Sequence, residues 1–162
     1  MIKKILLVIL IILILLVLAV VVLFAVKGSQ SRTGKALGMD NGQLQACPNK
    51  PNCVNSEFAN DTEHYTPAIS LDNSQLDSAE TAAKQALESL GGTIKTQSNG
   101  YIAAEFTSSI FGFVDDFELR LDRANQQLHL RSASRVGHSD LGANAKRVNA
   151  FKAAFSEKLK AL

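Results

Sequence analysis

The stretch Ile5–Val26, ILLVILIILILLVLAVVVLFAV, contains 22 consecutive residues without a charged, polar, Gly or Pro side chain. A helix rises about 1.5 Å per residue, so this run would be roughly 33 Å long and would match a hydrocarbon core about 30 Å thick. It exceeds the apolar region of a signal peptide and does not end in an Ala-x-Ala cleavage site. We therefore expect residues 1–27 to be an uncleaved transmembrane anchor that contacts membrane lipid through residues 5–26.

Basic residues flank both ends of this run. Lys3 and Lys4 precede it, and Lys27, Arg32 and Lys35 follow it. The positive-inside rule weighs the two sides nearly equally, but the short N-terminal tail favours a cytoplasmic N-terminus. We therefore expect a signal-anchor in the inner (cytoplasmic) membrane, crossed once, with the soluble domain on the periplasmic or other extracytoplasmic side of the cell envelope.

The remainder of the chain divides into a linker and one domain. Residues 28–43 are rich in Gly, Ser, Gln and Asn, which is typical of a flexible linker. Residues 44–162 are enough for one soluble domain with its own core. Without Lys3, Lys4 and Lys27 the chain carries 14 basic and 15 acidic residues. This balance argues against nucleic-acid binding, which needs a basic surplus.

Two segments of the domain, residues 75–90 and 145–162, have apolar residues at helical spacing. Gly91 supplies the left-handed residue expected after the first helix. The apolar stripe of the first helix consists of Leu76, Ala79, Ala83, Ala86, Leu87 and Leu90. The stripe of the second consists of Val148, Phe151, Phe155, Leu159 and Leu162.

Four segments between these helices are typical of strands, namely residues 93–97, 101–107, 112–122 and 127–134. Sequential strands with short connections favour an antiparallel meander. We therefore expect an α+β fold, in which a four-stranded antiparallel meander and two helices on one of its faces form a two-layer sandwich. The other face of the sheet is expected to stay largely in water, because its side chains are polar.

The register of these strands follows from their alternating side chains. Placing Leu121 opposite Leu128 pairs Glu118 with Arg131 on the polar face, as opposite charges on neighbouring strands. In the first hairpin, a three-residue turn over residues 98–100 would pair Ile94 with Ala104 and keep the apolar residues on one face.

The two cysteines of the chain, Cys47 and Cys53, close the loop CPNKPNC. In an exported domain, two nearby cysteines most often form a structural disulfide. A redox pair is the alternative, although redox motifs usually have two residues between the cysteines rather than five. A metal site is disfavoured, because four ligands with the usual spacing are missing.

A second group of candidate functional residues lies near the ends of the last two strands. Alternation places Asp115 on the apolar face, where a carboxylate needs a partner such as Arg135 or Arg147. One interpretation is a polar network that stabilises the fold. The other is a pocket that binds an anionic or polar ligand through its arginines. The candidate ligand- or partner-binding residues are Asp115, Asp116, Arg131, Arg135, Asp140 and Arg147.

A hydrolase is an alternative from the enzyme class. Ser139 lies next to His138, and Ser134 is close in the sequence, but a Ser hydroxyl must lie about 3 Å from a His nitrogen to be activated. The local sequence is also not the G-x-S-x-G motif. The two other histidines, His64 in a polar stretch and His129 on the polar face of a strand, are expected to be exposed.

Three stretches of the chain resemble the signatures of one family. They are LQACPNKPNCVNS at Leu44–Ser56, FGFVDD at Phe111–Asp116 and RSASRVGHSDLGANAKR at Arg131–Arg147. The family is the uncharacterised one catalogued as domain of unknown function 1499, and the resemblance covers about residues 37–160. It implies an export-associated domain, and it brings no established activity, ligand or catalytic residue.

These observations together favour a membrane-anchored, exported accessory or binding domain rather than an enzyme. The expected partner is an unknown protein or small molecule, and no cofactor or metal is expected. The hydrolase that uses Ser139 or Ser134 with His138 is one alternative. A purely structural envelope protein is the other.

Overall fold

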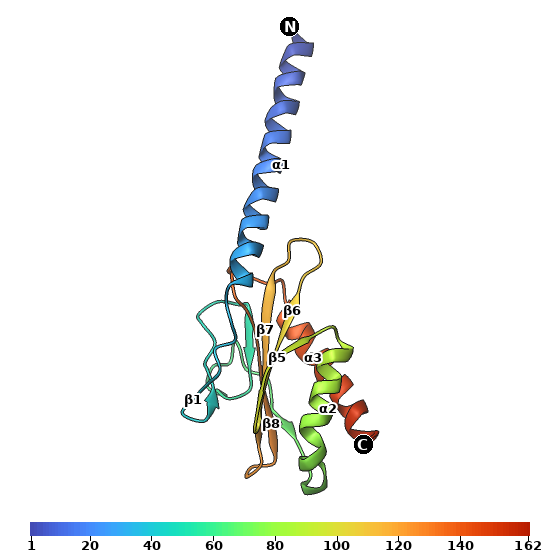
Figure 1. Ribbon diagram of the computed structural model, residues 1–162. Coiled ribbons are helices and arrows are strands. Elements are labelled where there is room, and N and C mark those ends of the chain that lie inside the picture. The colour runs from blue at the N-terminus through green and yellow to red at the C-terminus, as the bar shows by residue number, and fades with distance from the viewer.

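Helix α1, Ile2–Arg32, stands apart from the rest of the molecule over most of its length (Figure 1). The computed structural model describes residues 1–162, and α1 is the one helix in it that is long and apolar enough to cross a membrane. The helix continues beyond Val26 to Arg32, through the first part of the segment expected to be a linker. Gly28 and Ser31 are buried there, so the last turns of α1 lie against the domain.

The centre of the domain is the predicted antiparallel meander, which consists of β5 (Thr93–Ser98), β6 (Tyr101–Thr107), β7 (Val114–Asp122) and β8 (Gln127–Ser134). The prediction of four strands is wrong, because the sheet has six. Strands β3 (Cys53–Asn55) and β4 (Ile69–Ser70) both pair with β8 at its free edge. They are two or three residues long, too short to show an alternating pattern in the sequence. Strands β1 (Met39–Asp40) and β2 (Gln43–Leu44) form a separate hairpin.

The register agrees with the prediction at most positions. Leu121 pairs with Leu128 and Glu118 with Arg131. Ile94 pairs with Ala104, but the predicted three-residue turn is wrong, since Ser98 pairs with Tyr101 across a two-residue turn. A bulge between Ile94 and Thr96 supplies the extra residue that restores the apolar face.

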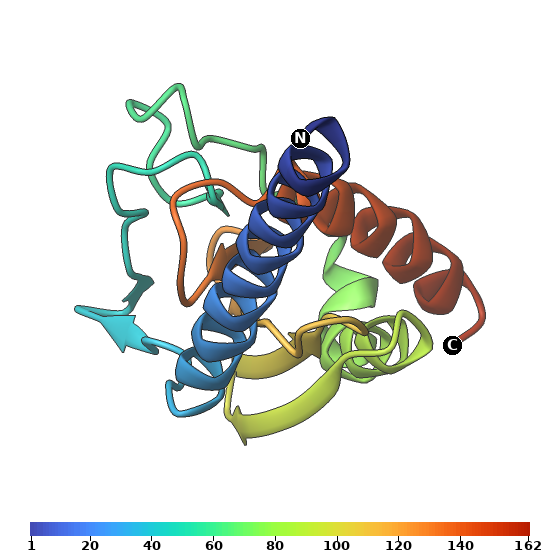
Figure 2. The ribbon, with the colours of Figure 1, turned by 90° about the horizontal axis from the view of Figure 1, so that it is seen from above.

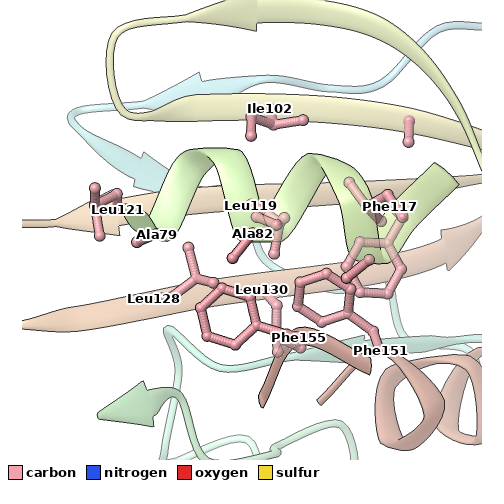
Figure 3. Packing of buried hydrophobic residues seen from close by; sticks show 14 of the residues in the cluster. Ala79, Ala82, Ile102, Phe117, Leu119, Leu121, Leu128, Leu130, Phe151 and Phe155 are labelled. Carbon is pink, nitrogen blue, oxygen red and sulfur yellow. The ribbon is translucent and has the colours of Figure 1, made fainter. Parts of the chain in front are cut away.

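Both predicted helices, α2 (Leu76–Ser89, after the 3₁₀ turn Asn73–Gln75) and α3 (Ala143–Lys160), cover one face of the sheet (Figures 1 and 2). Small alanines on α2 let that helix approach the sheet closely. Phenylalanine rings fill the space beneath α3, where the centroids of Phe117 and Phe151 are 4.9 Å apart (Figure 3). The centre of this core consists of Ala79, Ala82, Ala83, Leu87, Ile102, Phe117, Leu119, Leu130, Val148, Phe151 and Phe155.

The opposite face of the sheet is not in water, so that prediction is wrong. Residues 33–44 and Glu57 lie against it, on the side away from α2 and α3 (Figure 2). Glu118 is fully buried, and Asp116 and Arg131 are 5% and 3% exposed. Polar side chains can be buried on this face because they form ion pairs and hydrogen bonds with one another and with the segment that covers them.

Candidate functional site

The predicted pair of Glu118 and Arg131 lies at the centre of the covered face. Arg131 Nη1 donates to Glu118 Oε2 at 2.8 Å. The other carboxylate oxygen accepts hydrogen bonds from the Tyr101 hydroxyl at 2.7 Å and from the backbone N–H of Gly38 at 2.8 Å. Burial and the adjacent carboxylate raise the pKa of Tyr101, so its hydroxyl remains a donor. The pair therefore ties the segment after α1 to the sheet.

Arg135 forms a second ion pair at the edge of the same face. Its Nε and Nη2 donate to the two carboxylate oxygens of Asp116 at 2.8 and 2.7 Å, and Nη2 also contacts Glu105 at 2.6 Å. Burial opposes ionisation of Glu105, but hydrogen bonds from Arg135 and Lys95 outweigh it and lower its pKa. Because Nη1 of Arg135 donates to the carbonyl of Ser31 at 3.0 Å, the guanidinium joins α1 to the sheet.

A third ion pair, between Arg120 and Glu57, was not predicted from the sequence. Arg120 donates two hydrogen bonds to Glu57, at 2.7 and 3.1 Å, and the Glu57 side chain is 1% exposed. His129 is buried beside them rather than exposed, and burial lowers its pKa. The sequence does indicate that Arg120 lies on the same face as Glu118, because the two residues are two positions apart on one strand. Its partner lies 63 residues away, which no local pattern indicates.

Asp115 lies on the helix-covered side, opposite Ser134, as predicted. Its partner is Arg147, one of the two candidates, whose Nη2 donates to the carboxylate at 2.9 Å. Nη1 of Arg147 donates to Asn144 Oδ1 at 2.6 Å, and the guanidinium lies 4.8 Å from the centre of the Phe106 ring. Each of the three arginines predicted to bind a ligand is thus paired with a carboxylate of the domain.

Asp140 caps the first turn of α3. Its carboxylate accepts hydrogen bonds from the backbone N–H groups of Gly142 at 3.0 Å and Asn144 at 2.7 Å. This capping holds Leu141 in the left-handed region, at a φ of 55°, with 89% of the residue exposed. The left-handed region is unfavourable for leucine, so the cap holds an apolar side chain outward at the expense of backbone strain.

The residues of the alternative hydrolase site do not contact one another. His138 is exposed and forms no hydrogen bond with Ser134 or Ser139. The one Ser–His contact is between Ser56 and His129, 3.2 Å apart. There the Ser56 hydroxyl and the carboxylate of Glu57 approach the same ring nitrogen, whereas a catalytic triad uses the two nitrogens for different partners.

Cys47 and Cys53 are joined in a disulfide, at a Cα–Cα distance of 5.7 Å. His64 is buried beside this loop, not exposed as predicted, because both of its ring nitrogens have partners. Nδ1 lies 2.8 Å from Asp61 Oδ2, and Nε2 lies 2.9 Å from the carbonyl of Lys50. Burial opposes protonation, but the hydrogen bonds to Asp61 and Lys50 outweigh it and raise the pKa of His64. The protonated His64 ring therefore stabilises the Cys loop, because it bridges Asp61 and the carbonyl of Lys50.

We expect His64→Gln to destabilise the protein more in acid than in base. A His whose folded-state pKa is raised contributes stability that is present in full below its ordinary value of 6.5 and is lost as the pH rises through the raised value. The difference from wild type is expected to be about 1.5–3 kcal/mol near pH 5 and to shrink with increasing pH. Urea unfolding across pH measures it, and a difference that grows with pH would contradict the assignment. The lowered pKa of His129 has the opposite effect on the pH dependence of stability. Because wild type and variant both contain His129, this effect cancels in the difference between them.

A cavity of about 370 Å³ lies where α1 meets the domain. Helix α1 contributes Leu23 and Phe24 to its wall, and the sheet and the loop after β8 contribute Val114, Val136 and Leu141. Its polar lining residues include Lys27, Ser134, Ser139 and Asp140. The cavity is mostly apolar and is bounded by several of the predicted site residues.

The contact that forms this cavity is close. Gly28 packs directly on Phe111, and a Cβ atom there would lie 2.0 Å from the Phe111 carbonyl oxygen. One turn on, the Ser31 hydroxyl donates to the Gly28 carbonyl at 2.6 Å and accepts a hydrogen bond from the N–H of Val114 at 3.0 Å. The ring of Phe24 stacks on that of Phe111, with 5.3 Å between centroids. Glycine thus permits the end of α1 to dock on the domain.

Comparison with known proteins places the soluble part of the chain in a family. The family model described as "Protein of unknown function (DUF1499)" matches residues 43–155, most of the chain. The match includes the Cys loop, the strands that carry Glu118 and Arg131, and the loop that contains Leu141. No curated protein matches the chain.

Proposed function

The chain belongs to the family of proteins of unknown function DUF1499, and we propose that it is a membrane-anchored, exported domain that binds a lipid acyl chain in the cavity beside α1. The proposal places residues 5–26 in the bilayer, as their length and composition favour. It places the domain on the extracytoplasmic side, where a disulfide such as Cys47–Cys53 persists.

The single observation that carries the proposal is that the wall of the cavity belongs to the apolar run itself. Leu23 and Phe24 lie within residues 5–26, and they line the cavity together with Val136 and Leu141. If the run spans the bilayer, the cavity lies at the border of the hydrocarbon core. An apolar cavity of this size at that depth is open to acyl chains rather than to solutes in water. A purely structural envelope protein would need no such cavity.

Two exposed side chains support the same orientation. Outside α1, the most exposed large apolar residues are Leu141 at 89% and Ile110 at 82%. Leu141 lines the cavity, and Ile110 belongs to the loop between β6 and β7 that packs on α1 through Phe111. Apolar side chains in water are unfavourable in proportion to their area, and both residues would lie in lipid if the domain sits on the bilayer as proposed.

The proposal is tested with a phospholipid that carries a photoreactive group in its acyl chain, in cell membranes that contain the full-length protein. We expect labelling of the peptides that contain Ile110 and Leu141 as well as of α1. Val136→Trp, which fills the cavity, should remove most of the labelling at Leu141. Leu162→Trp, at an exposed position outside the cavity, is the matched control. Protease added to intact spheroplasts should remove the domain if it lies outside.

Labelling confined to residues 5–26 would contradict the lipid site. Equal labelling of Leu141 in the Val136→Trp and Leu162→Trp variants would do the same, because the lipid would then contact the outer surface and not the cavity. A domain that resists protease until the cells are lysed would contradict the proposed orientation.

A further inference from the structure

We propose that a second cavity, beneath the Cys loop, binds a small anion that also carries a hydroxyl group, such as a phosphate ester of a polyol. This cavity has a volume of about 460 Å³ and lies between residues 34–37, the Cys loop and the end of β8. It shares Ser134 and Gly137 with the cavity beside α1 but none of that cavity's apolar lining. The inference therefore does not depend on the lipid site.

The first argument is that two residues of this cavity each have a buried polar atom without a partner. The two atoms are Oδ1 of Asn52, a residue 2% exposed, and Nε of Arg131, a residue 3% exposed. Both residues line the cavity. A buried polar group without a partner costs about 1–3 kcal/mol, so such groups are rare unless something binds them.

The chemistry of these two atoms defines what would satisfy them. The amide nitrogen of Asn52 donates to the carbonyl of Gly137 at 3.3 Å, which fixes Oδ1 as the free end and as an acceptor. The Arg131 guanidinium donates through Nη1 to Glu118, which leaves Nε–H as a donor. The ligand must offer a donor to Asn52 and an acceptor to Arg131. A hydroxyl group beside an anionic oxygen provides both.

The charge around the cavity favours an anion. Arg131 and Arg135 line it, but Glu118 and Asp116 pair with them. Lys35 and Lys50 also line it, are exposed, and have no carboxylate partner. Two positive charges therefore remain, one on the segment after α1 and one on the Cys loop. Lysine ammonium groups bind phosphate as point charges, and the disulfide of Cys47, which lines the cavity as well, holds the loop in place.

The test is a calorimetric titration of the full-length protein, in nanodiscs of neutral phosphatidylcholine, with glycerol 3-phosphate and with sulfate, an anion that carries no hydroxyl group at neutral pH. We expect one site per chain and tighter binding of glycerol 3-phosphate. Lys35→Gln with Lys50→Gln should weaken both by about tenfold or more, because each lysine supplies a charge-assisted hydrogen bond. Lys146→Gln with Lys160→Gln, two exposed positions outside the cavity, is the matched control and should change neither.

Asn52→Ala tests the hydroxyl group separately. It should abolish the preference for glycerol 3-phosphate and leave the binding of sulfate unchanged. The backbone carbonyl of Asn52, which accepts hydrogen bonds from Ser134 and Asn144, is retained in this variant, so the fold is expected to survive.

Nanodiscs that contain phosphatidylglycerol identify the source of the anion. Competition with glycerol 3-phosphate would assign the site to a lipid headgroup, and no competition would assign it to a free solute. The proposal is overturned if neither anion binds the wild type, if the control double variant loses as much affinity as the lysine pair, or if Asn52→Ala keeps the preference. Labelling by the photoreactive lipid would be unaffected by any of these results, so the two proposals fail independently.

Discussion

Replacing Arg131 with methionine is expected to lower the free energy of unfolding by about 3–5 kcal/mol, because it leaves a buried charge without its partner. Glu118 is fully buried, and Arg131 is its one cationic partner, at 2.8 Å. Methionine is an unbranched side chain without a charge, so packing changes little. The loss of stability then measures mainly the effect of removing the charge. Urea unfolding of the full-length protein in detergent, followed by circular dichroism, measures it.

Two controls make this expectation specific. The double variant with Glu118→Gln and Arg131→Met should recover much of the loss, because the neutral amide still accepts from Tyr101 and Gly38 through its oxygen. Arg123→Met removes an ion pair of similar length, 3.0 Å to Asp77, whose arginine is half exposed. An exposed pair contributes about 0–1 kcal/mol. Equal losses in Arg123→Met and Arg131→Met would show that the covered face is open to water.

Replacing Gly28 with alanine is expected to detach the end of α1 from the domain. On helix propensity alone, Gly to Ala in a helix is favourable by about 1 kcal/mol. Here the new methyl group would lie 2.0 Å from the carbonyl oxygen of Phe111, a backbone atom that cannot yield as the end of a flexible side chain can. Helix and loop must therefore separate, and the hydrogen bond from Val114 to Ser31 is lost with them.

Hydrogen exchange measures this separation at the amide of Val114. Loss of a buried partner costs about 1–3 kcal/mol, so its exchange should be faster by about tenfold or more. The amide of Phe151, in the core on the other side of the sheet, should be unchanged. Ser29→Ala, at the exposed neighbouring position, is the matched control. If Gly28→Ala protects Val114 as well as Ser29→Ala does, α1 does not dock as described. The lipid site requires this docking, so Gly28→Ala should also abolish photolabelling at Leu141.

The sequence alone predicted the elements whose signal is local. The apolar run from Ile5 to Val26 needs no context, because its length and composition are sufficient to identify a candidate membrane span. The helices α2 and α3 repeat apolar residues at the helical period, and β7 and β8 alternate clearly enough to fix the pairing of Leu121 with Leu128. In the helices and strands a buried face imposes a period that is visible within one segment.

The tertiary structure decided which polar residues are buried. Alternation placed Glu118 and Arg131 on one face correctly, but it could not indicate that residues 33–44 and Glu57 cover that face. The partner of Arg120 is Glu57, 63 residues away, and the partner of the Ser31 carbonyl is Arg135, 104 residues away. Charged residues at alternate positions of a strand indicate a solvent-exposed face unless their partners are known. Partners that are distant in the sequence leave no local pattern.

The two cavities are also products of tertiary structure. One lies between Phe24 and Val136, and the other between Lys35 and Asn52. The sequence indicated that Cys47 and Cys53 form a disulfide. It did not indicate that the loop between them lines a polar cavity. A period along the chain reports which side of an element faces the core, whereas a cavity is the space left between elements. Its shape depends on how closely they approach, as Gly28 on Phe111 determines here.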